Sequence, residues 1–140
     1  MAFFISAAML FLSKLLTEKV AAEEKKKVVS WAKAVQILSE PSVEGDLTFY
    51  LDIIQANTTI PAIVVNEQGK ITQHCNLDSI KSLDENFLKK KLEVFKAENE
   101  PISIPVVKGI NHQVYYGEST VLQQLRYYPF VVLAVVALFM

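Results

Sequence analysis

The sequence predicts an α+β fold, in which a small four-stranded antiparallel sheet with packing helices lies between two apolar ends of a 140-residue chain. Three observations predict this class. Apolar residues in the first forty positions follow the 3-4 spacing of a helix. Short β-branched runs separated by glycine-containing turns follow, which is typical of strands. The twelve residues at each end are almost entirely apolar.

Both apolar ends are shorter than the roughly 20 residues that a helix needs to cross a bilayer. Met1–Leu12 is apolar except for Ser6, and Pro129–Met140 is apolar except for its proline. Arg126 and two tyrosines directly precede the second run, which is the composition that a membrane interface favours. We therefore expect two truncated membrane helices. The alternatives are a buried globular helix at either end, or a signal peptide at the first.

The segment Ser13–Glu40 predicts one long helix that stops before Pro41, because proline disfavours a helical residue before it. Residues 17–40 alone would span roughly 36 Å. One apolar stripe has the 3-4-3 spacing of a coiled-coil seam and predicts a dimer contact. Its members are Val28, Trp31, Val35 and Leu38. The alternative is that this stripe packs on the chain's own sheet.

A second helix is expected over Asp46–Ala56, with Asp46 as its N-cap. Two strands, Ala62–Asn66 and Lys70–Cys75, then form a predicted hairpin around Gly69. We expect the first strand to be central in the sheet and Gly69 to take a positive φ.

A third helix is predicted to begin at a capping box formed by Ser82 and Glu85 and to continue to about Asn99. Its apolar residues repeat with helical spacing and define one face. We therefore expect this helix to pack on the sheet.

Two further strands are expected at Ile102–Val107 and His112–Tyr116, joined by a turn over residues 108–111. Pro105 lacks a backbone N–H, so its strand should lie at a sheet edge or contain a bulge. A last helix from about Thr120 continues into the apolar end.

No catalytic constellation or nucleotide-binding motif is recognisable in the chain. Aromatic side chains with polar tips, and histidines beside strands, are the candidate ligand contacts, although such histidines are commonly only solvated. These candidates are Tyr115, Tyr116, His74 and His112. Neighbouring strand residues point to opposite faces, so only one tyrosine can line a given pocket.

One cysteine and two distant histidines cannot assemble a four-ligand metal site, so we expect no metal. Cys75 is expected to be a small buried apolar residue. The net charge of −1, without a basic stripe, also argues against nucleic acid as a partner.

Four segments carry a family resemblance: Asn57–Pro61, Val65–Ile71, Tyr115–Ser119 and Leu125–Pro129. Together they resemble the N-terminal sensory region of a bacterial membrane-bound sensor histidine kinase. The hairpin is similar to the opening strands of a PAS-type sensor domain. The resemblance therefore implies a small PAS-like antiparallel sheet, with a long membrane-emergent helix before it and a helix entering the membrane after it.

The resemblance divides the chain into a truncated membrane helix (1–16), a long connecting helix (17–40), a PAS-like sensor domain (41–119) and an exit helix with a second truncated membrane segment (120–140). It implies a parallel homodimer in the bacterial cytoplasmic membrane, with an extracytoplasmic middle domain. The lysines after the first apolar run locally favour the opposite orientation. ATP, Mg²⁺ and a response regulator would involve only cytoplasmic kinase domains, and we expect no cofactor and no enzyme activity in this chain.

Two alternatives remain. The chain could be a ligand-binding or interaction module of another membrane receptor, such as a chemoreceptor. It could also be a membrane-anchored structural protein without a signalling output.

Overall fold

The computed structural model describes residues 1–107 and 109–140. Lys108, part of the turn expected over residues 108–111, lies outside the described residues. The elements are α1 (Ala2–Ser39), α2 (Thr48–Ala56), β1 (Ala62–Val65), β2 (Ile71–Cys75), the 3₁₀ turn η1 (Lys81–Leu83), α3 (Glu85–Glu98), β3 (Ile102–Val107), β4 (Ile110–Tyr116) and α4 (Thr120–Phe139).

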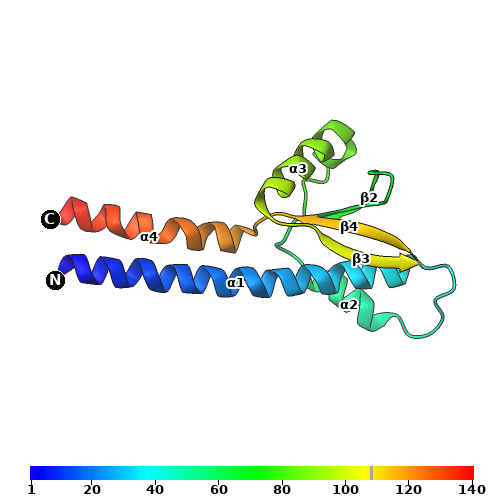
Figure 1. The fold of residues 1–140 in the computed structure, drawn as a ribbon, viewed down its shortest axis with the longest axis horizontal. Helices are drawn as coiled ribbons and strands as arrows, with labels where there is room; N and C mark the ends of the chain where they lie inside the picture. The colour runs from blue at the N-terminus through cyan, green and yellow to red at the C-terminus, as the bar shows by residue number, and fades with distance from the viewer. Residues whose placement is uncertain (108) are drawn as a thin grey trace.

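The long helix α1 runs along the whole molecule and organises the fold (Figure 1). Its C-terminal half lies beneath one face of the sheet, and α3 lies over the other face (Figure 1). Its N-terminal half pairs with the antiparallel α4, so that both chain ends lie together (Figure 1). We call this pair of helices the stalk. The short helix α2 packs against α1.

The sheet has the order β2-β1-β4-β3, and every neighbouring pair is antiparallel. The predicted four-stranded antiparallel sheet and the central position of its first strand are confirmed. The expectation for Pro105 is also confirmed, because β3 is an edge strand whose register shifts after this residue. Strand β4 begins at Ile110, two residues before the expected start.

Strand β1 is buried on both faces, which explains its unbroken apolar sequence. Ala62 and Val64 belong to the cluster that includes Val28 and Trp31 of α1. The alternate residues of β1 belong to a second cluster, formed with Leu92 and Phe95 of α3. The sheet therefore separates two apolar cores.

The second helix begins two residues later than expected. Leu47 occupies the N-cap position of α2, and the Asp46 carboxylate accepts a 3.0 Å hydrogen bond from the Thr48 N–H. Asp46 thus satisfies a first-turn donor, but it lies one residue before the N-cap instead of occupying that position.

The capping box expected at Ser82 is wrong, because Asp84 caps α3. The Asp84 carboxylate accepts a 2.9 Å hydrogen bond from the Asn86 N–H. Ser82 lies inside η1, where its hydroxyl is buried without a hydrogen-bond partner. The Asp78 carboxylate stabilises this turn by accepting hydrogen bonds from the N–H groups of residues 80 and 81. Asp84 follows the turn and has the extended backbone of an N-cap residue.

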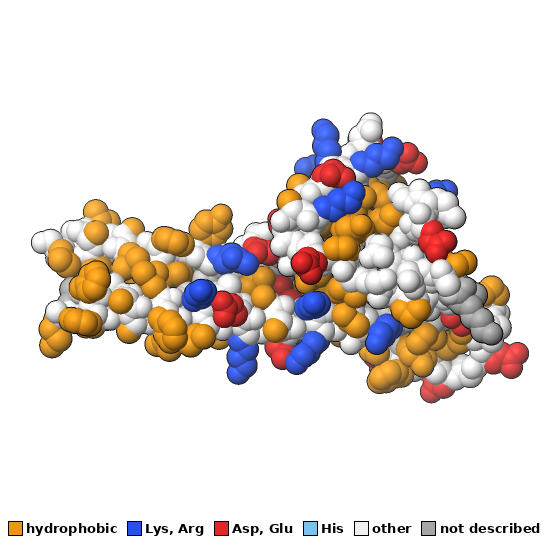
Figure 2. Space-filling view, viewed as in Figure 1, with side chains coloured by type: hydrophobic (Ala, Val, Ile, Leu, Met, Phe, Trp, Pro, Cys, Tyr) orange, Lys and Arg blue, Asp and Glu red, His pale blue; other side chains and the backbone are white. Residues whose placement is uncertain are grey.

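Among the described residues, one helix, α4, is long and apolar enough to cross a membrane. The apolar part of α1 does not qualify, because charged residues begin at Lys14. Of the two expected membrane segments, the C-terminal one alone lies in a helix that is long and apolar enough to cross a membrane. Apolar side chains nevertheless cover both helices of the stalk in Figure 2.

The hairpin turn yields a first prediction. Gly69 has a φ of 77°, as expected, and an added Cβ would meet no atom within 4 Å. Gly69→Val should therefore lower the free energy of unfolding by about 1–2 kcal/mol through backbone strain alone. Urea unfolding followed by circular dichroism measures this. Gly69→Asn is the control, because asparagine tolerates this conformation. Equal unfolding midpoints for the valine and asparagine variants would contradict the assignment.

Candidate functional site

Three residues, Gly117 to Ser119, connect the last strand to the apolar helix α4. The Gly117 N–H donates a 2.9 Å hydrogen bond to the Pro61 carbonyl, which ties the connector to the chain just before β1. A Cβ added at Gly117 would lie 2.5 Å from the Phe95 ring of α3. Because no side chain fits there, α3 packs directly on the connector backbone.

Ser119 is fully buried and joins the connector to both stalk helices. Its hydroxyl oxygen accepts a 3.1 Å hydrogen bond from the Leu122 N–H and so caps α4. The same hydroxyl donates to the Glu24 carboxylate of α1. Glu24 is only 7% exposed. A buried carboxylate therefore depends on the residue that starts α4.

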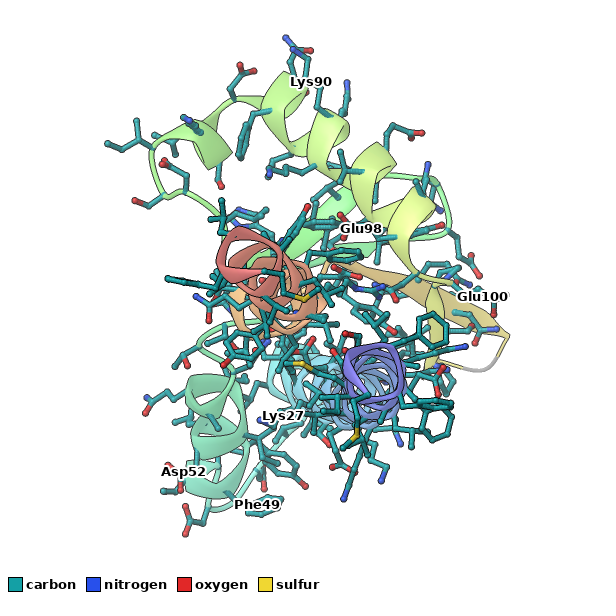
Figure 3. All side chains as sticks on the ribbon, turned by 90° about the vertical axis from the view of Figure 1, so that its left-hand side faces the viewer. Lys27, Phe49, Asp52, Lys90, Glu98 and Glu100 are labelled. Atoms are coloured by element: carbon teal, nitrogen blue, oxygen red, sulfur yellow. The ribbon has the colours of Figure 1, made fainter. Side chains whose placement is uncertain are left out.

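Glu118 links the connector to α3 and to the second turn of α4. Its N–H donates a 3.1 Å hydrogen bond to the Glu98 carboxylate, and its own carboxylate lies 2.6 Å from the Arg126 guanidinium. In Figure 3, Glu98 lies at the end of α3 near α4, whereas Lys90 points away. Arg126 is half exposed, so this ion pair orients the helix more than it stabilises it.

The connector is thus the point where α1, α3, β4 and α4 meet. Gly117 contacts α3, Glu118 contacts α3 and α4, and Ser119 contacts α1 and α4. A displacement of β4 cannot leave these contacts unchanged, because only three residues separate it from α4. We call Gly117–Ser119 with Glu24 the junction.

The two candidate tyrosines face opposite sides of the sheet, as their adjacency requires. Tyr116 is buried in the core against α1, where burial and then the nearby Glu24 carboxylate raise the pKa of its hydroxyl. Tyr115 packs on the α3 side, with the Lys96 ammonium 5.6 Å from its ring centre. Tyr116 is therefore part of the core beside the junction.

The two candidate histidines are likewise on opposite faces. His74 pairs with Ile63, which faces α3, and it is exposed. His112 pairs with Ile104, which faces α1. The four predicted contact residues therefore do not form one site. Only His112 lines the cavity described next.

A cavity of about 320 Å³ lies between the end of α1 and the sheet. We call it the His112 cavity. Its walls are mostly aliphatic side chains of α1 and the sheet, and several polar side chains also line it. It is lined by Ala32, Val35, Gln36, Ser39, Glu40, Pro41, Val64, Thr72, Gln73, Ile104, Val106, His112 and Val114.

The predicted dimer stripe lies partly in the core. Val28 and Trp31 are buried against the chain's own sheet, with exposed fractions of 0% and 3%. Val35 packs against the same core and lines the His112 cavity, and Leu38 is partly buried. The first two side chains are therefore occupied within one chain, and a seam would have to use other residues.

Cys75 is partly buried at the end of β2, within 3.5 Å of the Asn57 amide nitrogen. Burial raises the pKa of its thiol from 9.0 to about 11. Among the described residues, no group of His, Cys, Asp or Glu side chains is arranged to hold a metal ion.

Comparisons with known protein-family models, curated proteins and solved structures find no match to this chain. Gly117 to Ser119 belong to a segment that carries the family resemblance, but the sequence did not predict the junction that they form. A serine before an apolar helical run is an N-cap signal that could have located Ser119. Nothing in the sequence distinguishes Glu24 from the other charged residues around it.

The junction yields a second prediction. Ser119→Ala removes the cap of α4 and leaves the buried Glu24 carboxylate without its hydroxyl donor. The free energy of unfolding should fall by about 2–3 kcal/mol. Urea unfolding measures the loss. Thr120→Ala, at an exposed neighbour, is the control and should change stability by less than about 0.5 kcal/mol. Equal losses would show that the buried contact contributes nothing.

A third prediction concerns the thiol. A rise in the pKa of Cys75 from 9.0 to about 11 lowers the thiolate fraction at pH 8 roughly 100-fold. Alkylation by iodoacetamide should therefore be about two orders of magnitude slower in the folded chain than in urea. Mass spectrometry over time measures both rates. Similar rates would mean that the thiol is accessible and ionises normally.

Proposed function

We propose that this chain is the sensory input region of a membrane-bound sensor histidine kinase in a bacterial cytoplasmic membrane. The α+β domain, with its PAS-like sheet, would lie outside the membrane and detect a signal there. The observation that carries the proposal is the junction, because it joins the sheet to the apolar helix α4 through three residues and ties both to α1.

Three of the four segments that resemble sensor kinases lie at this junction or directly after it, and the fourth, Val65–Ile71, is the hairpin turn at the opposite end of the sheet. Pro61 ends the first of them and accepts the hydrogen bond of Gly117, which belongs to another. Leu125 to Pro129 follows along α4, where Leu125 lines a groove against α1. Residues distant in the sequence thus contribute to one structural unit, and this unit is the one that would transmit a signal.

The two apolar ends lie at the same height in the stalk, which supports the membrane assignment. One groove brings Leu12 and Leu16 of α1 together with Leu125 and Tyr128 of α4. The charged residues that border the apolar zones therefore lie at similar heights on both helices, and Figure 2 shows blue side chains where the stalk meets the domain. Tyr127 is 69% exposed at this level, as an interfacial tyrosine would be.

In this proposal the signal moves the stalk helices relative to each other, which is a known class of switching transition. Homodimerisation belongs to the proposal, through exposed surfaces other than Val28 and Trp31. Phosphoryl transfer, with ATP and Mg²⁺, and contact with a response regulator would belong to cytoplasmic domains outside this chain.

The coding sequence downstream of Met140 tests the function. A helix pair with a phosphoacceptor histidine, followed by an ATP-binding domain, is the expected result, and the full protein should then autophosphorylate with ATP. A methylated coiled coil would instead identify a chemoreceptor. A stop codon directly after Met140 would overturn both readings and favour an anchored structural protein.

A fourth prediction tests the membrane placement on this chain itself. In a Cys75→Ser background, Lys89→Cys on exposed α3 should react with a membrane-impermeant maleimide in intact cells. Val135→Cys in the apolar part of α4 is the matched variant and should stay unlabelled, although its side chain is 47% exposed in the chain alone. Labelling of the Lys89→Cys variant only after lysis would place the domain in the cytoplasm.

A further inference from the structure

We propose that the His112 cavity binds a small apolar molecule that carries one hydrogen-bond-donating head group, a hydroxyl or an amine. The role of this molecule as the signal rests on the proposed function, whereas its binding to the cavity does not. The volume of about 320 Å³ is at the lower end for small-molecule pockets and too small for a helix or a folded partner.

The cavity lies between the last two turns of α1 and residues of all four strands. The helix ends at Ser39, and Pro41 directs the chain away from it. The sheet residues that line it belong to the core, since Val114 and Ile104 are 0% and 4% exposed. An apolar molecule would extend the same core, and its burial is favourable by roughly 0.8 kcal/mol per methylene.

Several polar side chains of the cavity are already engaged. Gln36 donates a 2.6 Å hydrogen bond to the Pro105 carbonyl. Ser39 donates to the Val35 carbonyl at 2.7 Å, and Thr72 donates to the Val64 carbonyl. Within the described part of the chain, the side chains that line the cavity and make no such bond are His112, Gln73 and Glu40.

These remaining groups select the head group. The Glu40 carboxylate is exposed at the end of α1, where it accepts hydrogen bonds and repels an anion through a solvent-screened interaction, so a carboxylate on the ligand is disfavoured. The C-terminal end of α1 also disfavours an anion, because its free carbonyl groups carry partial negative charge. No basic residue in the last turn offsets this charge. A hydroxyl or an amine donates to Glu40, and a hydroxyl also pairs with the His112 ring. The cavity therefore selects alcohols and amines over acids.

One strand connects the cavity to the junction. His112, Val114 and Tyr116 alternate along β4 and lie on its α1-facing side. The first two line the cavity, and the third packs beside Glu24 at the junction. On the opposite wall, Ala32 and Val35 belong to the helix that carries Glu24. An occupant would therefore contact both elements that continue to the stalk.

Straight-chain probes test the cavity directly on the full chain in detergent micelles. The probes are 1-hexanol, 1-octanol, 1-octylamine and octanoate. Trp31, the single tryptophan, lies in the same buried cluster as Ala32 and reports binding by its fluorescence. Saturable binding is expected, with affinity rising about fourfold per methylene between the two alcohols. Octanoate should bind at least tenfold more weakly than octanol or octylamine.

Matched variants separate cavity binding from partition into micelles. Val35→Phe fills the cavity and should weaken octanol binding at least tenfold, while Lys33→Phe, on an exposed position of α1, should not. If Val35→Phe does not fold, Ser39→Phe at the exposed end of the helix replaces it. His112→Leu should weaken octanol binding, and His74→Leu should leave it unchanged.

Several outcomes would overturn the proposal. Equal octanol binding by the parent and the filled variant would place the probe in the micelle. Stronger binding of octanoate would refute the head-group assignment. If a probe binds in the cavity without altering autophosphorylation of the full protein, the binding site is supported. The role of the bound molecule as the signal is then refuted. Absence of a kinase would refute the proposed function without affecting the binding result.

Discussion

The hydrogen bond between the Ser119 hydroxyl and the buried Glu24 carboxylate is the constraint on which the stalk depends. A carboxylate removed from water is costly unless it is hydrogen-bonded, so the two residues must stay together in the folded chain. Because Ser119 also caps α4, the bond determines where this helix begins and how it is placed against α1. The partners are 95 positions apart in the sequence, so the contact also brings the two ends of the chain together.

The same constraint also bears on the opposite end of the domain. With Glu24 held at the junction, the position of α1 along the sheet is fixed, and its last turns form one wall of the His112 cavity. The apolar wall of this cavity is continuous with the core. Strand β4 spans the distance between them, from the His112 side chain to Tyr116. The cavity at one end and the junction at the other are thus joined by one strand and one helix, which is the connection that the proposed sensing role requires.

The element order, the sheet class and several local devices could be predicted from the sequence. Gly69 takes the expected positive φ, and Pro105 lies on an edge strand, because both follow from the covalent structure of single residues. The capping box at Ser82 was wrong because a preceding carboxylate, Asp78, closes a 3₁₀ turn around it. Of the four candidate contact residues, only His112 lines the cavity, since the strand pattern does not reveal where a cavity forms between the sheet and a helix.

By itself, then, the sequence determined what each segment is: helices from apolar periodicity, turns from glycine and proline, and an apolar zone at each end. Only the tertiary structure decided what covers each surface. The stripe containing Val28 and Trp31 has the spacing of a seam, yet it packs on the chain's own sheet. Glu24 resembles its charged neighbours, yet it is the one that is buried. The physical reason is that periodicity specifies an apolar face or a charged position, whereas the partner that removes it from water is chosen by residues far along the chain.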